Sequence, residues 1–174
     1  MFKERRIMAN SPTAFSAPQR TIHWLTVLLV LFNLILPGSI ERVVDLLGGG
    51  KVPTSSETLS ANLHIYSGIA ILTLTVLRLA LRAIQGVPEK PADEPDIVGL
   101  LAKASHALFY AVLIAMPALG IAKYFFDVDA AGDLHGGPVK LLLWALIGMH
   151  VLAVLVHQFW WRTNILARMT TRQA

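Results

Sequence analysis

The chain alternates four long apolar stretches with short polar segments. The first begins after Ser16-Ala17-Pro18, a sequence that suits a helix start, and stops at Pro37-Gly38. The other three cover about 55–84, 97–124 and 135–161. At about 1.5 Å per residue, each is long enough to cross a hydrocarbon core of about 30 Å. The pattern predicts an all-α fold, a bundle of four transmembrane helices.

A soluble four-helix bundle is the alternative, and it would need a polar face on each helix. The runs VLLVLFNLILP and AILTLTVL have no such face. Apolar residues make up 55% of the chain and charged residues 15%, and the apolar ones are gathered rather than dispersed, which favours a membrane protein. We expect one membrane domain, residues 18–165, between a flexible tail (1–17) and a second tail (166–174).

The segments between the apolar stretches carry turn and cap signals. Segment 38–54 contains three consecutive glycines and predicts a flexible loop, and Thr54-Ser55-Ser56-Glu57 is a capping box that opens the second helix. The proline-rich segment 86–95 cannot be helical. Segment 125–134 is expected to be an acidic loop. Pro117 lies inside the third stretch, where it should kink the helix.

Basic residues fall unevenly on the two sides of the predicted bundle. Of the 15 lysines and arginines, eleven lie in the two tails and around the connector 86–95, and four lie on the opposite side. Because the cytoplasmic side of a membrane protein carries this excess, both termini are predicted to be cytoplasmic. The N-terminal MFKERR precedes small and polar residues and predicts an uncleaved tail. The net charge of +4 is not clustered, so we expect no nucleic-acid binding.

Histidine is the candidate chemistry of this chain. The sequence has no cysteine, which excludes disulfides, iron–sulfur clusters and covalently attached haem, so any metal must be held by histidine. An ionisable residue inside a membrane is costly and marks a functional site by default. By depth, the six histidines sort into His64 and His135 near the periplasmic face, His23 and His106 near the cytoplasmic face, and His150 and His157 in the inner half of the fourth stretch.

The spacing within the fourth stretch fits two stacked cofactors. His135 and His150 are fifteen residues apart, which is about 22 Å along a helix and leaves their side chains within roughly 60° of each other around its axis. One helix can therefore offer a ligand to each of two sites. Haem b, which is flat, apolar and held by axial histidine, meets these demands. His64 is the most secure ligand, because the second stretch has no other histidine.

The remaining polar groups have several interpretations. His106 and His157 are the histidines expected to be spare, as partners of a quinone or of a haem propionate. Arg78 and Arg82 are either ordinary positive-inside anchors or partners of haem propionates at the cytoplasmic tier. A histidine-based metal transporter is the alternative from another class, but the centres of the first three stretches lack the carboxylates that divalent-cation paths need.

Several motifs resemble those of a known family. They are IHWL at 22–25, NLHIYSGI at 62–69, VLRLALR at 76–82, SHALFYAVLIAMPALGI at 105–121, and LH…IGMHVLAVLVHQFWW at 134–161. Together they resemble the prokaryotic cytochrome b561 family, four-helix proteins of the bacterial inner membrane that hold two haem b groups. The resemblance covers roughly residues 18–170.

The resemblance implies a ligand set and a function. His23 with His150 would ligate the cytoplasmic haem, and His64 with His135 the periplasmic one. Electrons would pass between a periplasmic donor or acceptor and the quinone pool, with ubiquinone as the expected acceptor. One family member oxidises superoxide, which makes superoxide oxidase a candidate activity. The alternative is a cytochrome b subunit that anchors a separate periplasmic oxidoreductase and takes its electrons. The oligomeric state stays open.

Two features of this chain depart from the family pattern. The family usually spaces the fourth-stretch histidines by fourteen residues, whereas here Gly136-Gly137-Pro138 lies within a spacing of fifteen. We expect an irregular turn before the regular helix to absorb the extra residue. Depth alone prefers His157 over His150 as the partner of His23, and the family pattern prefers His150.

The charges expected near the periplasmic tier give opposite indications about binding of a small anion. Lys123 and Lys140 could attract a small anion such as superoxide. The acidic residues Asp127, Asp129 and Asp133 argue mildly against it.

Overall fold

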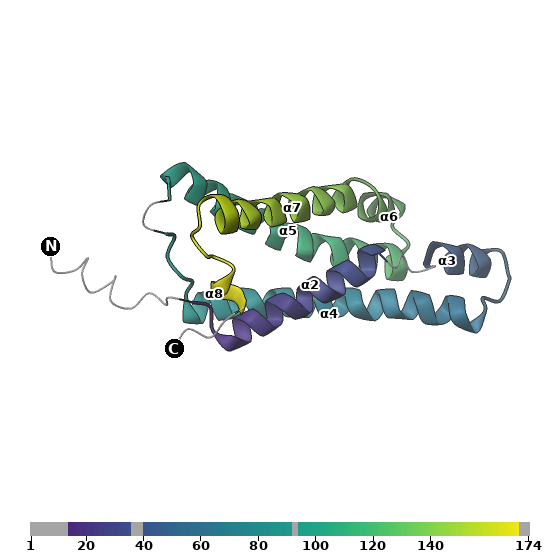
Figure 1. The fold of residues 1–174 in the computed structure, drawn as a ribbon. Coiled ribbons are helices and arrows are strands. Elements are labelled where there is room, and N and C mark those ends of the chain that lie inside the picture. The colour runs from purple at the N-terminus through teal and green to yellow at the C-terminus, as the bar shows by residue number, and fades with distance from the viewer. Residues whose placement is uncertain (1–13, 36–39, 92–93, 171–174) are drawn as a thin grey trace.

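The computed structural model describes residues 14–35, 40–91 and 94–170, and its regular structure there is entirely helical. The all-α prediction is therefore confirmed for this part of the chain. In chain order the elements are α2 (Ala17–Ile35), α3 (Ile40–Gly48), α4 (Ser55–Gln85), α5 (Asp96–Phe126), α6 (Asp129–Gly136), α7 (Pro138–Leu155), the π-helical turn η1 (Val156–Trp160) and α8 (Ala167–Thr170) (Figure 1).

The long helices α2, α4, α5 and α7 lie side by side along a common direction (Figure 1). Helix α2 packs on α4, α4 on α5, and α5 on α7, so neighbours in sequence are neighbours in space. At one end, which we call the α6 end, α3 packs on α4, and α6 packs on α5 and α7. At the other, the α8 end, the indole of Trp24 in α2 donates to the carbonyl of Met169 in α8 at 2.9 Å.

Side-chain caps explain where two of these helices begin. Thr54 Oγ1 accepts from the backbone of Glu57, and the Glu57 carboxylate accepts from the backbone of Thr54, so the predicted capping box is confirmed. Ser16 and Gln19 make the same reciprocal pair before α2. The buried Gln19 amide also donates to the carbonyl of Gly86 at 3.0 Å, which joins the start of α2 to the end of α4.

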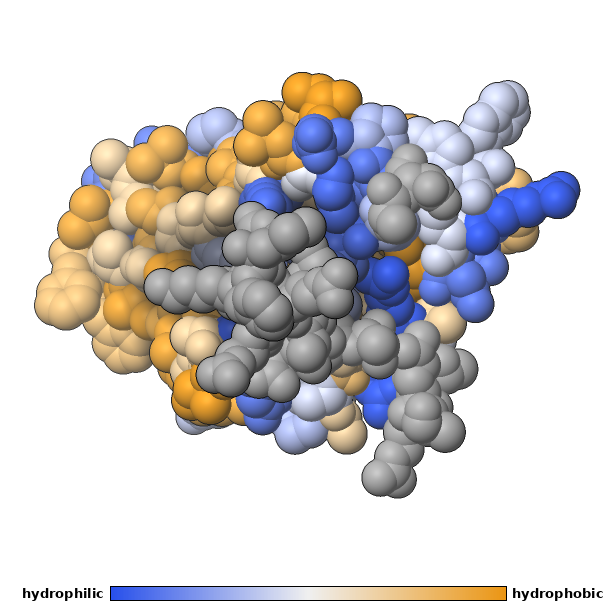
Figure 2. Space-filling model, turned by 90° about the vertical axis from the view of Figure 1, so that its left-hand side faces the viewer, coloured by the Kyte–Doolittle hydropathy of each residue, from blue (hydrophilic) through white to orange (hydrophobic). Residues whose placement is uncertain are grey.

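The surface of the bundle suits a lipid environment. Three helical stretches are long and apolar enough to cross a membrane: Ser55–Gln85, Asp96–Phe126 and Asp129–Trp160. Large apolar side chains face outward on them, as Leu141 does with 70% of its surface exposed. Figure 2 looks onto the α8 end and shows hydrophobic residues over one part of the view and hydrophilic residues over another. Helix α2 is not among the three stretches, so a fourth span stays a prediction.

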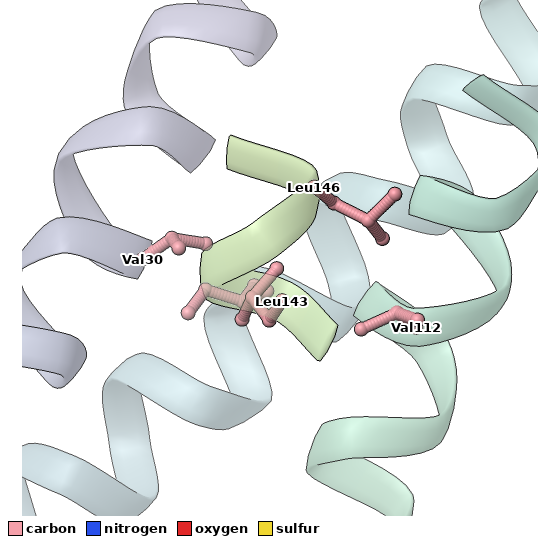
Figure 3. Packing of buried hydrophobic residues seen from close by; sticks show 5 residues of the cluster. Val30, Val112, Leu143 and Leu146 are labelled. Atoms are coloured by element: carbon pink, nitrogen blue, oxygen red, sulfur yellow. The ribbon is translucent and has the colours of Figure 1, made fainter. Parts of the chain in front are cut away.

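The interior between the helices is small. Its buried apolar cluster consists of Val30, Ile71, Val112, Leu143 and Leu146, which come from all four long helices. Figure 3 shows Leu143 and Leu146 on α7 between Val30 of α2 and Val112 of α5. This cluster lies between the two ends of the bundle at which the histidines gather.

Two segments expected to be loops contain helices. Helix α3 lies within 38–54 because Ile40, Val43, Val44 and Leu47 follow a helical period, and this helix buries Val43. Helix α6 begins at Asp129 within the expected loop 125–134. The connector 86–95 has no helix in its described residues, and α5 stays helical through Pro117. The predicted stop at Pro37-Gly38 lies outside the described residues.

Candidate functional site

The histidines meet at both ends of the bundle. At the α6 end, His64 of α4 faces His135 of α6, with ring centroids 5.9 Å apart. At the α8 end, the ring of His150 in α7 lies 6.4 Å from that of His23 in α2 and 5.7 Å from that of His106 in α5. We call these groups the α6-end site (His64, His135) and the α8-end site (His23, His106, His150).

The position of His135 depends on a break in the fourth apolar stretch. Helix α6 ends at Gly136 and α7 begins at Pro138, so His135 lies in the last turn of a separate short helix. Gly137 between them donates its N–H to the carbonyl of Asp133 at 3.0 Å, while Pro138 needs no donor in a first turn. The irregular turn expected before the regular helix is therefore present.

Two backbone features fix the ring of His135. Its Nδ1 donates to the carbonyl of Met116 in α5 at 2.7 Å, so a neutral ring has an unprotonated Nε2. Metal-binding histidines are commonly oriented by such a second hydrogen bond. Gly120, also in α5, allows the ring to approach closely, because a Cβ at that position would lie 3.2 Å from His135 Cε1.

A cavity of about 860 Å³ lies beside the α6-end site. Ligand pockets ordinarily measure about 300–1,000 Å³. His64, Gly68, Pro117, Gly120 and His135 are among its lining residues, and α3 supplies apolar side chains to its wall. His64 Nδ1 is buried and has no hydrogen-bond partner among the described residues. A buried polar atom of this kind calls for a partner that belongs to a ligand or to water.

The ring separations at both sites match those of two histidines that share one metal. Histidine nitrogens bind metals at about 2 Å, so two imidazoles on opposite sides of one metal have centroids about 6 Å apart. The separations of 5.9 Å for His64–His135 and 6.4 Å for His23–His150 agree with this requirement. The 5.7 Å between His106 and His150 agrees with it as well. The geometry therefore brings together the four predicted ligands and adds His106 as a neighbour of His150.

His106 and His23 differ in which ring nitrogen carries the proton and in the group that hydrogen-bonds to the ring. His106 Nδ1 donates to the carbonyl of Ala102 at 2.6 Å, which leaves its Nε2 unprotonated in the neutral ring. His23 Nδ1 lies 2.7 Å from an Arg78 nitrogen. Because a guanidinium can only donate, Nδ1 accepts this hydrogen bond, and the proton of a neutral His23 ring is on Nε2. Arg78 must therefore release His23 before Nε2 can bind a metal. The guanidinium groups of Arg78 and Arg82 also lie over the ring of Tyr110, at 6.0 and 5.4 Å.

His157 does not belong to the α8-end site. Its ring is buried against Trp161, its Nδ1 lies 2.9 Å from Thr163 Oγ1, and its Nε2 lies 3.8 Å from the Glu94 carboxylate. The reasoning from depth that made His157 the partner of His23 is not supported by this arrangement, which has His150 beside His23.

The charges around the α6-end cavity do not favour a small anion in the way that Lys123 and Lys140 suggested in the sequence. Lys123 donates to Asp127 at 2.9 Å and to Asp129 at 2.5 Å, so two carboxylates balance its charge. Both aspartates line the cavity together with Asp133, and α3 adds Asp45, a residue that the sequence analysis did not single out. Lys140 is not among the lining residues. The helical period of 40–47 was the signal that could have placed Asp45 here.

Apolar helices that present facing histidine pairs are the construction of a membrane b-type cytochrome. The comparisons with known proteins agree with that class. A sequence model of prokaryotic cytochrome b561 matches residues 14–172. The chain is 33% identical to cytochrome b562 of Cereibacter sphaeroides, over 93% of this chain and 98% of that protein. It is 31% identical to the probable superoxide oxidase CybB of Yersinia pestis, over 91% and 97% of the two chains.

A third relative, cytochrome b561 homolog 1 of Escherichia coli K12, is 25% identical over 91% of this chain and 98% of that protein. The chain belongs to the prokaryotic cytochrome b561 family. It is a membrane cytochrome b of electron transfer, and the family implies haem b as its cofactor.

Proposed function

We propose that this chain carries electrons across the bacterial inner membrane through two haem b groups, one at each end of the bundle. His64 and His135 would hold one haem, and His23 and His150 the other. The observation that carries the proposal is the presence of a facing histidine pair at each end. With four spans and the basic α8 end in the cytoplasm, the α6-end site faces the periplasm.

Haem held by His64 and His135, and by His23 and His150, would supply one-electron transfer. The chain's own residues orient the histidines. The Met116 carbonyl holds the Nδ1 proton of His135, and the Ala102 carbonyl that of His106. Arg78, which lies against His23, and Arg82, which lies over Tyr110, would pair with haem propionates. Ubiquinone is the proposed partner at the α8 end.

Two periplasmic electron donors fit the family, and the charges favour one of them. Superoxide is supported by the likeness to a probable superoxide oxidase. However, the cavity is lined by four carboxylates and by one lysine whose charge two of them balance. Such a lining repels a small anion and attracts a cationic surface. It supports the second candidate, a cytochrome b that takes electrons from a separate, basic redox protein, over superoxide.

The test is a count of haem per chain, together with the reduced-minus-oxidised visible spectrum of the purified protein. We expect two b-type haems in the wild type. His64→Ala and His135→Ala should each lose one haem, and His23→Ala and His150→Ala the other. His157→Gln is the matched control and should keep both. A wild type with one haem, or a His157 variant that loses haem while His150→Ala keeps two, would contradict the proposed ligands.

A further inference from the structure

Helix α3 has a defined C-terminal cap in the segment that the sequence predicted to be a flexible loop. Gly50 has a φ of 69° and donates its N–H to the carbonyl of Leu47 at 3.1 Å. Lys51 donates to the carbonyl of Leu46 at 2.7 Å. These two hydrogen bonds form a Schellman motif, in which a positive φ favours glycine. The glycines after α3 therefore end a helix instead of leaving the segment irregular.

An ion pair and apolar packing attach α3 to the start of α4. Arg42 Nε pairs with the carboxylate of Glu57, whose side chain is 16% exposed and completes the capping box of α4. Val43 of α3 is buried, and α3 packs on α4. His64 follows Glu57 by two helical turns, about 10 Å. These contacts hold α3 beside the α6-end site.

The side of α3 that lines the α6-end cavity is largely apolar. Ile40, Val44 and Leu47 follow a spacing of i, i+4 and i+7, and all three are lining residues. Val44 and Leu47 keep 38% and 59% of their surface exposed, although water is an unfavourable neighbour for such side chains. The same cavity is lined by His64, whose buried Nδ1 has no hydrogen-bond partner in the described part of the chain. An apolar wall and a histidine pair on one cavity suit a flat, apolar group that binds histidine.

We propose that α3 is part of the haem-binding site at the α6 end, with Val44 and Leu47 against the haem that His64 and His135 would hold. This inference rests on the proposed function. It assigns a cofactor contact to the segment between the first two apolar stretches, which contains no histidine. Two consequences follow, because the contact removes apolar surface of both groups from water. The α6-end haem dissociates slowly, and the backbone of α3 is protected while this haem is bound.

The rate of haem loss tests the first consequence. The purified, haem-loaded protein is mixed with excess apomyoglobin, and the visible spectrum follows haem transfer. Leu47→Ser should speed transfer of the α6-end haem about tenfold, because full burial of a leucine is worth roughly 10–100-fold in an equilibrium constant. Val52→Ser is the matched control, since Val52 lies in the same connector, is 90% exposed and is not among the lining residues. Transfer from Leu47→Ser at the rate of the wild type would overturn the proposal.

Hydrogen exchange of the amides of 40–48 tests what covers α3. In the haem-loaded wild type these amides should exchange more slowly than in His64→Ala, which should lack the α6-end haem. They should exchange in His23→Ala as in the wild type, because this variant should lack only the other haem. Equal protection in all three proteins would overturn the proposal and would mean that lipid, detergent or a second copy of the chain covers the apolar side.

The haem count of the same samples separates this inference from the proposed function. A wild type from which His64→Ala removes no haem would refute both. Two haems in the wild type and one in His64→Ala, with unchanged exchange of 40–48, would refute the role of α3 and leave the proposed ligands in place.

Discussion

Replacing Gly120 tests whether the ring of His135 is placed as a ligand. A Cβ added at this position would lie 3.2 Å from Cε1 and 3.4 Å from Nδ1 of the ring, so the ring must move by a few tenths of an ångström. The ring is held by its 2.7 Å bond to the Met116 carbonyl, and a shift of about 0.4 Å still leaves a weak hydrogen bond. Gly120→Ala should therefore weaken haem binding at the α6 end, and Gly120→Val should abolish it.

The expected loss of haem affinity can be distinguished from an effect of Gly120→Ala on helix stability. Alanine stabilises a helix interior by up to about 1 kcal/mol relative to glycine, so Gly120→Ala favours the fold of α5 while it perturbs the site. Loss of support around a metal-binding histidine typically costs about 10–100-fold in affinity, equivalent to about 1.4–2.7 kcal/mol.

The assay is haem titration of each purified variant, followed by redox titration of the visible spectrum. Gly48→Ala is the control at the same end, since no atom lies within 4 Å of a Cβ there. The haem at the α8 end should be unaffected in every variant. If Gly120→Val binds two haems with the affinity and spectrum of the wild type, the ring of His135 is not where an axial ligand must be.

Two further predictions concern charge. In the double variant Asp127→Asn/Asp129→Asn, two carboxylates near the cavity lose their charge, so the reduced protein should be oxidised roughly tenfold faster by the ferricyanide anion at low salt and more slowly by the hexaammineruthenium cation. Oxidation rates equal to those of the wild type would refute the role of the acidic lining. Arg78→Gln removes one positive charge beside the α8-end site, so reduction of a haem bound there should become less favourable by roughly 1–2 kcal/mol in a redox titration. An unchanged midpoint potential would mean that Arg78 does not lie near the cofactor.

The sequence predicted most of the helices because their signals are local. Apolar length, the Thr54–Glu57 capping box and the proline-rich connector each act within a few residues, and the structure has them where expected. Helix α3 was missed because the three glycines that start at its last residue dominated the interpretation of 38–54, although Ile40, Val43, Val44 and Leu47 follow a helical period.

The candidate sites were predictable only as far as histidine depth allowed. Spacing along one helix placed His135 and His150 in different tiers, and the structure separates them in that way. No spacing rule shows which polar groups meet across elements. The contact of Arg78 with His23, the carbonyl of Met116 on His135 and the approach of Glu94 to His157 join residues 55, 19 and 63 positions apart.

The two ends of the bundle differ in their charges and in the polar groups that they present. At the α6 end, four carboxylates help to line a cavity that reaches a histidine pair, and one of its buried nitrogens has no hydrogen-bond partner in the described part of the chain. Such a lining favours a cationic molecule over an anion. At the α8 end, Arg78 contacts His23, His106 adjoins His150, and a buried His–Glu pair lies further along the chain. This asymmetry follows if a soluble protein is served at the α6 end and a quinone at the α8 end.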